Sequence, residues 1–149
     1  MSQNSPSPAQ LEWERHVPPA VATDVIWKLD AYRACLFLLD RVQSDMPRVE
    51  ERVEVKDQLV RGAGDVAAAL SEGYSRATRI DRLRFYGYAL GSVRECTVWY
   101  LGLRDRLPAA LLDERLELVS RCRALILGVI HSTRRRPPDE SRRRGEFEA

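Results

Sequence analysis

Side chains that commonly carry chemistry are few in this sequence and lie far apart. Neither histidine, His16 or His131, belongs to a pattern of closely spaced ligands such as HExxH or ExxH. The three cysteines, Cys35, Cys96 and Cys122, lie among apolar residues, where a thiol acts as a small hydrophobic group. The phosphate-binding patterns GxxxxGK[ST] and GxGxxG do not occur. We therefore predict a protein that is not an enzyme and that carries no catalytic residue, metal or cofactor.

Arginine is the residue type that could bind a polyanion here. Six arginines cluster around a predicted turn between two helices: Arg61, Arg76, Arg79, Arg82, Arg84 and Arg94. Three tyrosines are interleaved with them: Tyr74, Tyr86 and Tyr88. Because arginine pairs with phosphate and aromatic rings stack on exposed bases, this combination suits RNA. In the alternative, Asp65, Glu72 and Asp81 pair with the arginines as a structural network, and the tyrosines lie in the core or at an interface.

The charge of the chain is small overall but unevenly distributed. The 149 residues include 24 basic and 22 acidic side chains, for a net charge of +2. Residues 1–60 carry 7 basic and 10 acidic side chains, a net of −3, whereas residues 61–149 carry 17 and 12, a net of +5. This bias is compatible with nucleic-acid binding, although a solvated face of mixed charge has a similar composition. The few scattered cysteines favour a cytoplasmic protein, and no apolar run approaches the ~20 residues of a membrane span.

The positions of the prolines predict where helices must end. Proline costs about 3 kcal/mol inside a helix, and the segments between the prolines repeat their apolar residues every three or four positions. The predicted helices are Asp24–Ser44, Val49–Glu72, Arg79–Arg106 and Leu111–Thr133. Gly73 is expected to end the second helix in a left-handed conformation, and Thr78 with Asp81 resembles a capping box for the third. Short links between these helices favour an all-α, antiparallel, up-and-down four-helix bundle.

Both ends of the chain have a polar composition that favours disorder. Residues 1–22 are rich in serine and proline, and residues 134–149 contain six arginines and four acids. Segments of this kind bury too little apolar area to offset the entropy of ordering. We therefore expect a flexible leader at 1–22, a folded bundle at 23–133 and an Arg-rich flexible tail at 134–149.

Two of the predicted helices carry more apolar surface than a single bundle can cover. Apolar residues surround most of the circumference of the first and third helices, and Gly87 and Gly91 leave room for another backbone on the third. Helices of this kind pack against further copies or partners. The candidate interface residues are Trp27, Phe37, Tyr88 and Trp99.

Three segments in order resemble a known family. They read DQLVR at 57–61, LSEGYSR at 70–76 and RFYGYALGSVRE at 84–95, and DVIW at 24–27 precedes them. This set is similar to that of the four-helix-bundle proteins encoded by intervening sequences of bacterial 23S ribosomal RNA genes, over roughly residues 24–133. The family usually has a Ser-Ile-Pro-x-Asn-Ile segment before its Glu-Gly pair, whereas this chain reads GDVAAAL at 64–70. Any role of that asparagine is therefore absent here.

The resemblance implies a fold, an assembly and a class of ligand. The family implies a closed homopentamer of antiparallel bundles and a role in RNA binding. In a related branch, the accessory proteins of diversity-generating retroelements, a basic pentameric barrel binds a reverse transcriptase and its RNA template. Carried over to this sequence, Glu72, Gly73 and Arg76 form the turn that fixes the second helix against the third. Arg84 and Glu95 are candidates to pair within that network or across a subunit boundary.

Two hypotheses of function follow from this sequence. In the first, the protein is a homo-oligomer, expected to be a pentamer, that binds RNA or DNA as an accessory factor. In the second, it is a protein–protein scaffold, such as an accessory subunit of a reverse transcriptase, without affinity for nucleic acid. We favour the first, because a ring multiplies the small charge excess of each chain by the number of its subunits.

Overall fold

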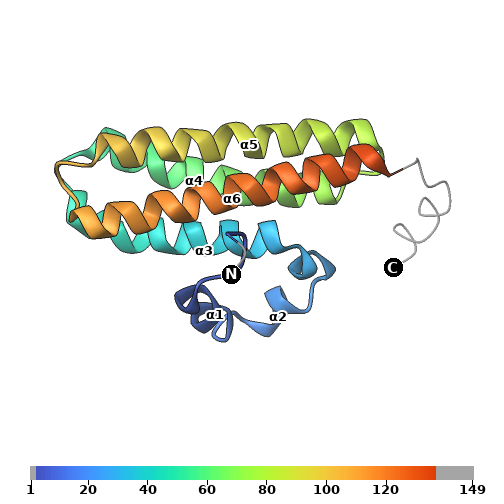
Figure 1. Ribbon diagram of the computed structural model, residues 1–149, viewed down its shortest axis with the longest axis horizontal. Helices are drawn as coiled ribbons and strands as arrows, with labels where there is room; N and C mark the ends of the chain where they lie inside the picture. Colours follow the sequence, from blue (N-terminus) through green and yellow to red (C-terminus); the bar gives the residue numbers. More distant parts are fainter. Residues whose placement is uncertain (1–2, 137–149) are drawn as a thin grey trace.

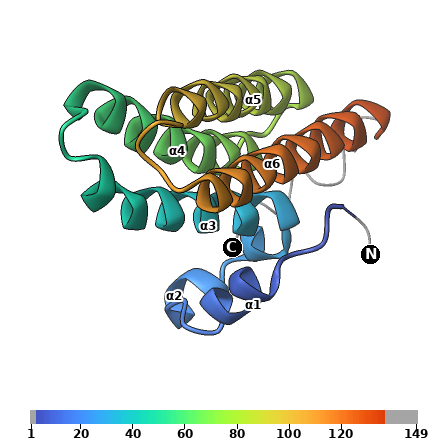
Figure 2. The ribbon, with the colours of Figure 1, turned by 60° about the vertical axis from the view of Figure 1, so that its left-hand side comes forward.

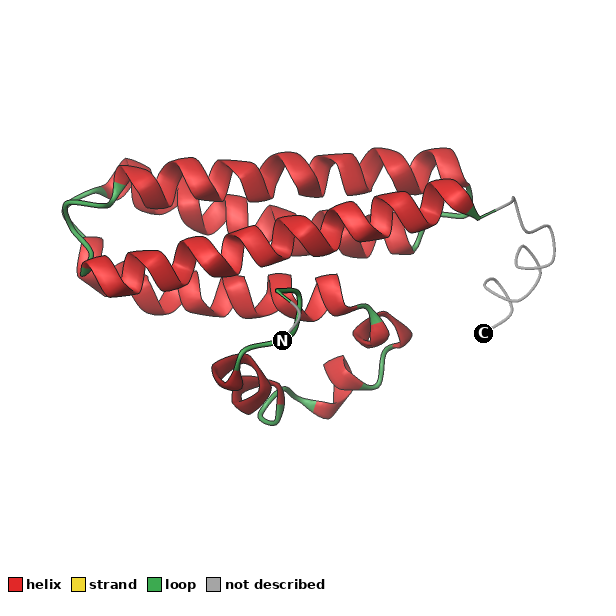
Figure 3. Ribbon diagram, viewed as in Figure 1, coloured by secondary structure: helices red, strands yellow, loops and turns green. Residues whose placement is uncertain are grey.

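Helices dominate the computed structural model, which describes residues 3–136 (Figure 1). This range contains six α-helices, two short 3-10 helices and no strand (Figure 3). The elements are α1 Pro8–Glu14, α2 Pro19–Ala22, η1 Val25–Lys28, α3 Asp30–Asp45, η2 Met46–Val49, α4 Val53–Tyr74, α5 Arg79–Gly102 and α6 Ala109–Arg135. The prediction of an all-α fold is confirmed for this range, although the helices outnumber the four expected.

The four long helices α3, α4, α5 and α6 lie side by side, each antiparallel to the one before it (Figures 1 and 2). α3 and α5 each contact both α4 and α6. Between these helices lies one apolar core, to which every long helix contributes fully buried residues. Examples are Leu38 of α3, Leu59 of α4, Val93 of α5 and Ile126 of α6. Repeats of three and four residues place these side chains on one face of each helix, and the hydrophobic effect then drives the faces together.

The first predicted helix, 24–44, is interrupted at Leu29. The backbone of Leu29 is extended, with φ −81° and ψ 111°, so η1 and α3 are separate elements. The sequence is compatible with Thr23 as the cap before this helix, but the carboxylate of Asp24 caps η1 by accepting a hydrogen bond from the amide of Ile26 at 3.1 Å. Thr23 instead donates its hydroxyl to the carbonyl of Pro19 at 2.7 Å. The predicted second helix begins at Val53 instead of Val49 because η2 occupies the positions before it.

Gly73 lies in the last turn of α4, which ends one residue later at Tyr74, and its role differs from the predicted cap. No glycine in residues 3–136 has a positive φ, so the expected left-handed conformation does not occur. Gly73 is buried, and a Cβ atom there would lie 2.7 Å from the ring of Tyr86. Glycine is therefore needed because α5 passes too close for a side chain. The predicted cap of α5 is confirmed, since the hydroxyl of Thr78 accepts a hydrogen bond from the amide of Asp81 at 3.2 Å.

The leader expected at residues 1–22 contains regular structure that packs on the long helices. The hydroxyl of Ser7 caps α1, and proline follows in its first turn. Trp13 packs on Phe37 of α3, with ring centroids 5.6 Å apart. Gln10 is only 3% exposed and hydrogen-bonds the guanidinium of Arg121 on α6. A few large contacts of this kind order the segment despite its polar composition.

The expected flexible tail begins within a helix. Arg134 and Arg135 form the last turn of α6, and the chain leaves the helix at Arg136. The rest of the predicted tail, residues 137–149, lies outside the described residues. Among the helices of residues 3–136, none is both long and apolar enough to cross a membrane.

A buried ion pair joins three of the long helices at the end where α5 leads into α6. The carboxylate of Asp45 on α3 accepts hydrogen bonds from Nε of Arg115 on α6 at 2.7 Å and from the hydroxyl of Tyr100 on α5 at 2.8 Å. Asp45 is 2% exposed and Arg115 6% exposed. Burial, followed by the charge of Asp45, raises the pKa of Tyr100 far above its usual value, so the phenol remains a proton donor. The charges of the pair are therefore compensated inside the fold.

Candidate nucleic-acid interface

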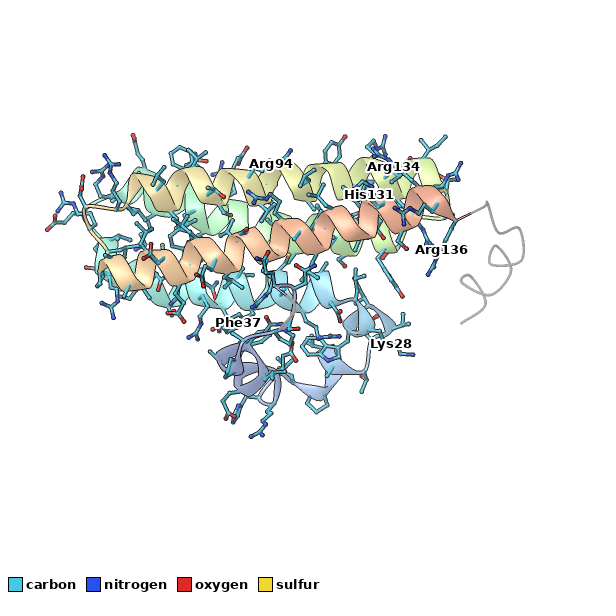
Figure 4. All side chains as sticks on the ribbon, in the orientation of Figure 1. Lys28, Phe37, Arg94, His131, Arg134 and Arg136 are labelled. Carbon is cyan, nitrogen blue, oxygen red and sulfur yellow. The ribbon has the colours of Figure 1, made fainter. Side chains whose placement is uncertain are left out.

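Seven arginines come together at the end of the long helices where α4 leads into α5, opposite the Asp45–Arg115 ion pair. Four of them, Arg76, Arg79, Arg82 and Arg84, surround the turn between α4 and α5, as the sequence predicts. The other three, Arg134, Arg135 and Arg136, come from the end of α6, which the sequence analysis assigned to the tail. The guanidinium of Arg79 donates a hydrogen bond at 3.0 Å to the carbonyl of Arg136 and so joins the two groups. We call these seven residues the arginine end. Figure 4 shows Lys28, His131, Arg134 and Arg136 toward this end of the molecule.

Two arginines of this end are paired with acids three or four positions away in the sequence. Arg76 lies 2.7 Å from the carboxylate of Glu72, and Arg84 lies 3.4 Å from that of Asp81. The structural alternative in the sequence analysis is therefore correct for these two residues. Within residues 3–136, neither Arg134 nor Arg135 forms an ion pair. The arginine end thus keeps an excess of positive charge on its surface.

The other end of the long helices, where α5 leads into α6, has a balanced surface charge. A cavity of about 420 Å³ lies there between η2 and the α5–α6 link. Its charged lining consists of three arginines and three acids: Arg48, Arg52, Arg106, Glu50, Glu51 and Asp105. Arg106 and Glu51 form an ion pair at 3.0 Å. The two ends of the molecule therefore differ in net surface charge.

The three tyrosines predicted beside the arginines have different surroundings. Tyr86 is 3% exposed and belongs to the core, whereas Tyr74 is half-buried. Tyr88 is 56% exposed and meets Phe85 edge to face, with centroids 5.5 Å apart. Only Tyr88, of these three, presents a largely open ring. Phe85, which the sequence analysis did not select, lies between Tyr88 and the arginines.

The structure does not bring Arg61 and Arg94 to the arginine end. Each lies fifteen positions along its helix from Arg76 or Arg79, or about 22 Å at 1.5 Å per residue. Both are exposed, and neither has an ionic or hydrogen-bonding partner among the described residues (Arg94 is labelled in Figure 4). Of the six arginines predicted to cluster, four therefore lie at the arginine end and two lie on the sides of the long helices.

The predicted turn residues Glu72, Gly73 and Arg76 do lie together. Glu72 holds Arg76, and the guanidinium of Arg76 covers the ring of Phe85 at 4.5 Å. Gly73 meanwhile admits the ring of Tyr86. The three residues thus hold the end of α4 against the start of α5. Arg84 pairs with Asp81 within its own helix, and Glu95 is exposed.

The four predicted interface residues differ in exposure. Phe37 is 4% exposed because Trp13 of the leader covers it, so in this chain it is not available to another subunit. Trp27 and Trp99 are half-buried, whereas Tyr88 is open. The structure adds a stripe on the outer side of α5 that the sequence analysis located only by its glycines. This stripe comprises Ile80, Gly87, Gly91 and Val98.

The outer stripe of α5 is apolar and uncovered. Ile80 is 79% exposed and Val98 61% exposed. A Cβ atom at Gly87 or Gly91 would meet nothing within 4 Å. The four positions recur at intervals of seven, four and seven residues, so they share one side of α5, with the exposed Arg84 and Arg94 on the intervening turns. Such a stripe is open to close approach by another backbone.

The cysteines lie in the core and are chemically quiet. Cys35, Cys96 and Cys122 are all free thiols without measurable exposure. Burial raises the pKa of Cys96 to about 12, so its reactive thiolate is scarce at neutral pH. Within residues 3–136, no group of three or more His, Cys, Asp or Glu side chains could hold a metal ion.

Comparison with known proteins identifies the family. A family model described as "23S rRNA-intervening sequence protein" matches residues 26–134. No curated protein matches the sequence. Among solved structures, a protein of unknown function from the S23 ribosomal protein family of Bacteroides thetaiotaomicron aligns with a TM-score of 0.63 at 14% identity, covering 67% of this chain and 97% of that one. That likeness supports the fold. Because the family model spans most of the sequence, the chain belongs to the 23S rRNA-intervening sequence protein family.

Proposed function

We propose that this protein is a non-catalytic accessory factor that assembles with copies of itself and binds RNA or another nucleic acid through the arginine end. The observation that carries the proposal is the convergence of two arginine groups, from the α4–α5 turn and from the end of α6. Guanidinium groups pair with phosphate, and each phosphate contact releases counterions. Such binding depends on the backbone, has little sequence preference and weakens as salt rises.

Self-assembly would strengthen binding by presenting several arginine ends at once. The outer stripe of α5 supports contact between copies, because an uncovered apolar line with two open glycines suits helix-to-helix packing. Five copies are expected from the resemblance described in the sequence analysis. The three free thiols suit the reducing cytoplasm, where we place this role.

The test compares two triple variants of equal charge in a retardation assay with structured RNA. Arg79→Ala, Arg82→Ala and Arg134→Ala remove three charges from the arginine end, whereas Arg48→Ala, Arg61→Ala and Arg94→Ala remove three exposed charges elsewhere. We expect the first variant to bind about tenfold more weakly or worse at low salt, with a slope of log affinity against log salt that is smaller by about 3. The second variant should bind nearly as the wild type does. Equal weakening by both variants would discard the arginine end.

The second candidate is a protein–protein scaffold, such as a reverse-transcriptase subunit, without affinity for nucleic acid. The stripe on α5 favours it as well, because an apolar line can receive a different protein. The ion pairs of Arg76 and Arg84 also reduce the charge available to phosphate. The two candidates differ in the retardation assay: a scaffold leaves the RNA unshifted even at low salt.

A further inference from the structure

The arginine end continues into a chain of flat side chains along α5. The guanidinium carbons of Arg76 and Arg84 lie 4.5 and 5.2 Å from the centroid of the Phe85 ring. The ring of Tyr88 meets Phe85 at 5.5 Å with an interplanar angle of 88°. Charged and aromatic planes thus follow one another from the α4–α5 turn to the exposed Tyr88. We call these four residues the planar cluster.

The two arginines of the planar cluster are held in place by acids. Arg76 pairs with Glu72 and Arg84 pairs with Asp81, yet their side chains remain 44% and 55% exposed. An acid beside an arginine offsets its charge and so reduces its attraction for phosphate. The planar face of the guanidinium still stacks on aromatic rings and bases. These two arginines are therefore better suited to stacking than to phosphate binding.

Three arginines outside the planar cluster, Arg79, Arg134 and Arg135, are not paired with an acid in residues 3–136 and are therefore better suited to phosphate binding. Within the described residues Arg134 and Arg135 form no ion pair, and the guanidinium of Arg79 donates a hydrogen bond to the backbone carbonyl of Arg136. Their charge is not offset by a carboxylate. The surface around the start of α5 therefore combines exposed charge without a carboxylate partner among the described residues and exposed flat groups.

We propose that the ligand is single-stranded nucleic acid, whose unpaired bases stack on Tyr88 and on the guanidinium faces of Arg76 and Arg84 while its backbone follows the other arginines. This inference rests on the proposed function and specifies its ligand. In a duplex the base faces are stacked on one another and cannot reach Tyr88, whereas unpaired bases can. Stacking tolerates any base, because every base has a π-face.

The experiment measures fluorescence anisotropy with the full chain and one labelled 20-nucleotide RNA. The RNA is used without internal pairing, and again after annealing to its complement. A single-stranded DNA of the same sequence forms a third arm, because its bases offer the same faces. The variants are Tyr88→Ala, Tyr88→Phe and, as a matched control, Val53→Ala, which shortens an exposed side chain of α4 outside the outer stripe.

We expect wild-type protein to bind the single strands more tightly than the duplex. Tyr88→Ala should weaken single-strand binding about tenfold, in the RNA and the DNA arm alike, with less than a twofold change for the duplex. Its salt dependence should stay as in the wild type, because no phosphate contact is lost. Tyr88→Phe, which keeps the ring, should restore the affinity, and Val53→Ala should leave it unchanged.

The results that overturn this inference differ from those that overturn the proposed function. Equal affinity for single strand and duplex, with no effect of Tyr88→Ala, removes the stacking role and leaves nucleic-acid binding intact. A changed particle mass for Tyr88→Ala in light scattering, with unchanged strand preference, places Tyr88 between copies instead. If wild-type protein binds none of the three nucleic acids, the proposed function fails as well.

Discussion

The close packing of α4 on α5 depends on the absence of a side chain at Gly73. Every rotamer of a larger residue begins with a Cβ atom, and here that atom would lie 2.7 Å from the ring of Tyr86 and 3.1 Å from Cβ of Phe85. Backbone movement is the only relief, because the ring of Tyr86 is itself buried. The ion pair of Glu72 with Arg76 lies at the same turn.

Gly73→Ala should therefore lower the free energy of unfolding by about 1–3 kcal/mol, the usual cost of forcing an extra methyl group into a packed core. Gly64→Ala is the matched control, since both glycines lie on α4 and a Cβ atom at Gly64 meets nothing within 4 Å. That control should be stabilised by up to about 1 kcal/mol through helix propensity. Urea unfolding at one fixed protein concentration measures both. A neutral Gly73→Ala would mean that α5 lies farther from α4 than described.

The sequence could predict a need for glycine at position 73 but not its cause. A glycine at the end of a helical pattern ordinarily indicates a left-handed cap, which depends only on local backbone geometry. The approach of Tyr86 is a tertiary contact between two helices, and no local pattern reports it. The cap at Thr78 was predictable because the hydrogen bond it makes lies within three residues.

At the scale of elements, the Asp45–Arg115–Tyr100 cluster holds α3, α5 and α6 in register. Sequence reasoning did not find it. Asp45 at a helix end and Arg115 in a mixed-charge helix look like ordinary surface residues, and seventy positions separate them. Only the assembled fold shows that both are buried. The contacts of the leader were not predictable for a related reason, because Trp13 and Gln10 gain them from α3 and α6.

Substitutions in this cluster should lower the free energy of unfolding by unequal amounts. Asp45→Ala leaves the guanidinium of Arg115 buried without its partner, so we expect a loss of about 3–5 kcal/mol in the free energy of unfolding. Tyr100→Phe removes one hydrogen bond and keeps the ion pair, so the expected loss is about 1.5 kcal/mol. Chemical unfolding followed by circular dichroism gives both values. Equal losses would show that the ion pair contributes little beyond the phenol.

At the scale of the whole molecule, we expect the outer stripe of α5 to determine whether copies associate. The order of the long helices, their helical periodicity and the open glycines followed from the sequence. Which aromatic residues stay exposed did not, because the cover that Trp13 provides for Phe37 comes from a segment expected to be flexible. The apolar surface is thus narrower than predicted and centred on α5.

Gly91→Gln tests this surface without disturbing the fold of one chain. A Cβ atom at Gly91 meets nothing within 4 Å, so the new side chain fits within the single chain and improves helix propensity. If copies pack there, the glutamine separates them, and light scattering should show a fall from a multiple of 17.1 kDa toward that mass. Gly64→Gln, at an open glycine of α4, is the control and should keep the assembly. A wild-type protein that stays at 17.1 kDa at high concentration contradicts self-assembly.

The contrast between the two ends of the long helices would also affect how the proposed anionic ligand arrives. One end balances three arginines with three acids around its cavity and compensates Asp45 with Arg115 inside the fold, whereas the other exposes arginines in excess. A rod with this distribution behaves as an electric dipole, and a polyanion diffusing past it experiences a torque before any contact forms. Encounters are thereby oriented as well as accelerated, and raising the ionic strength should slow association far more than it speeds release.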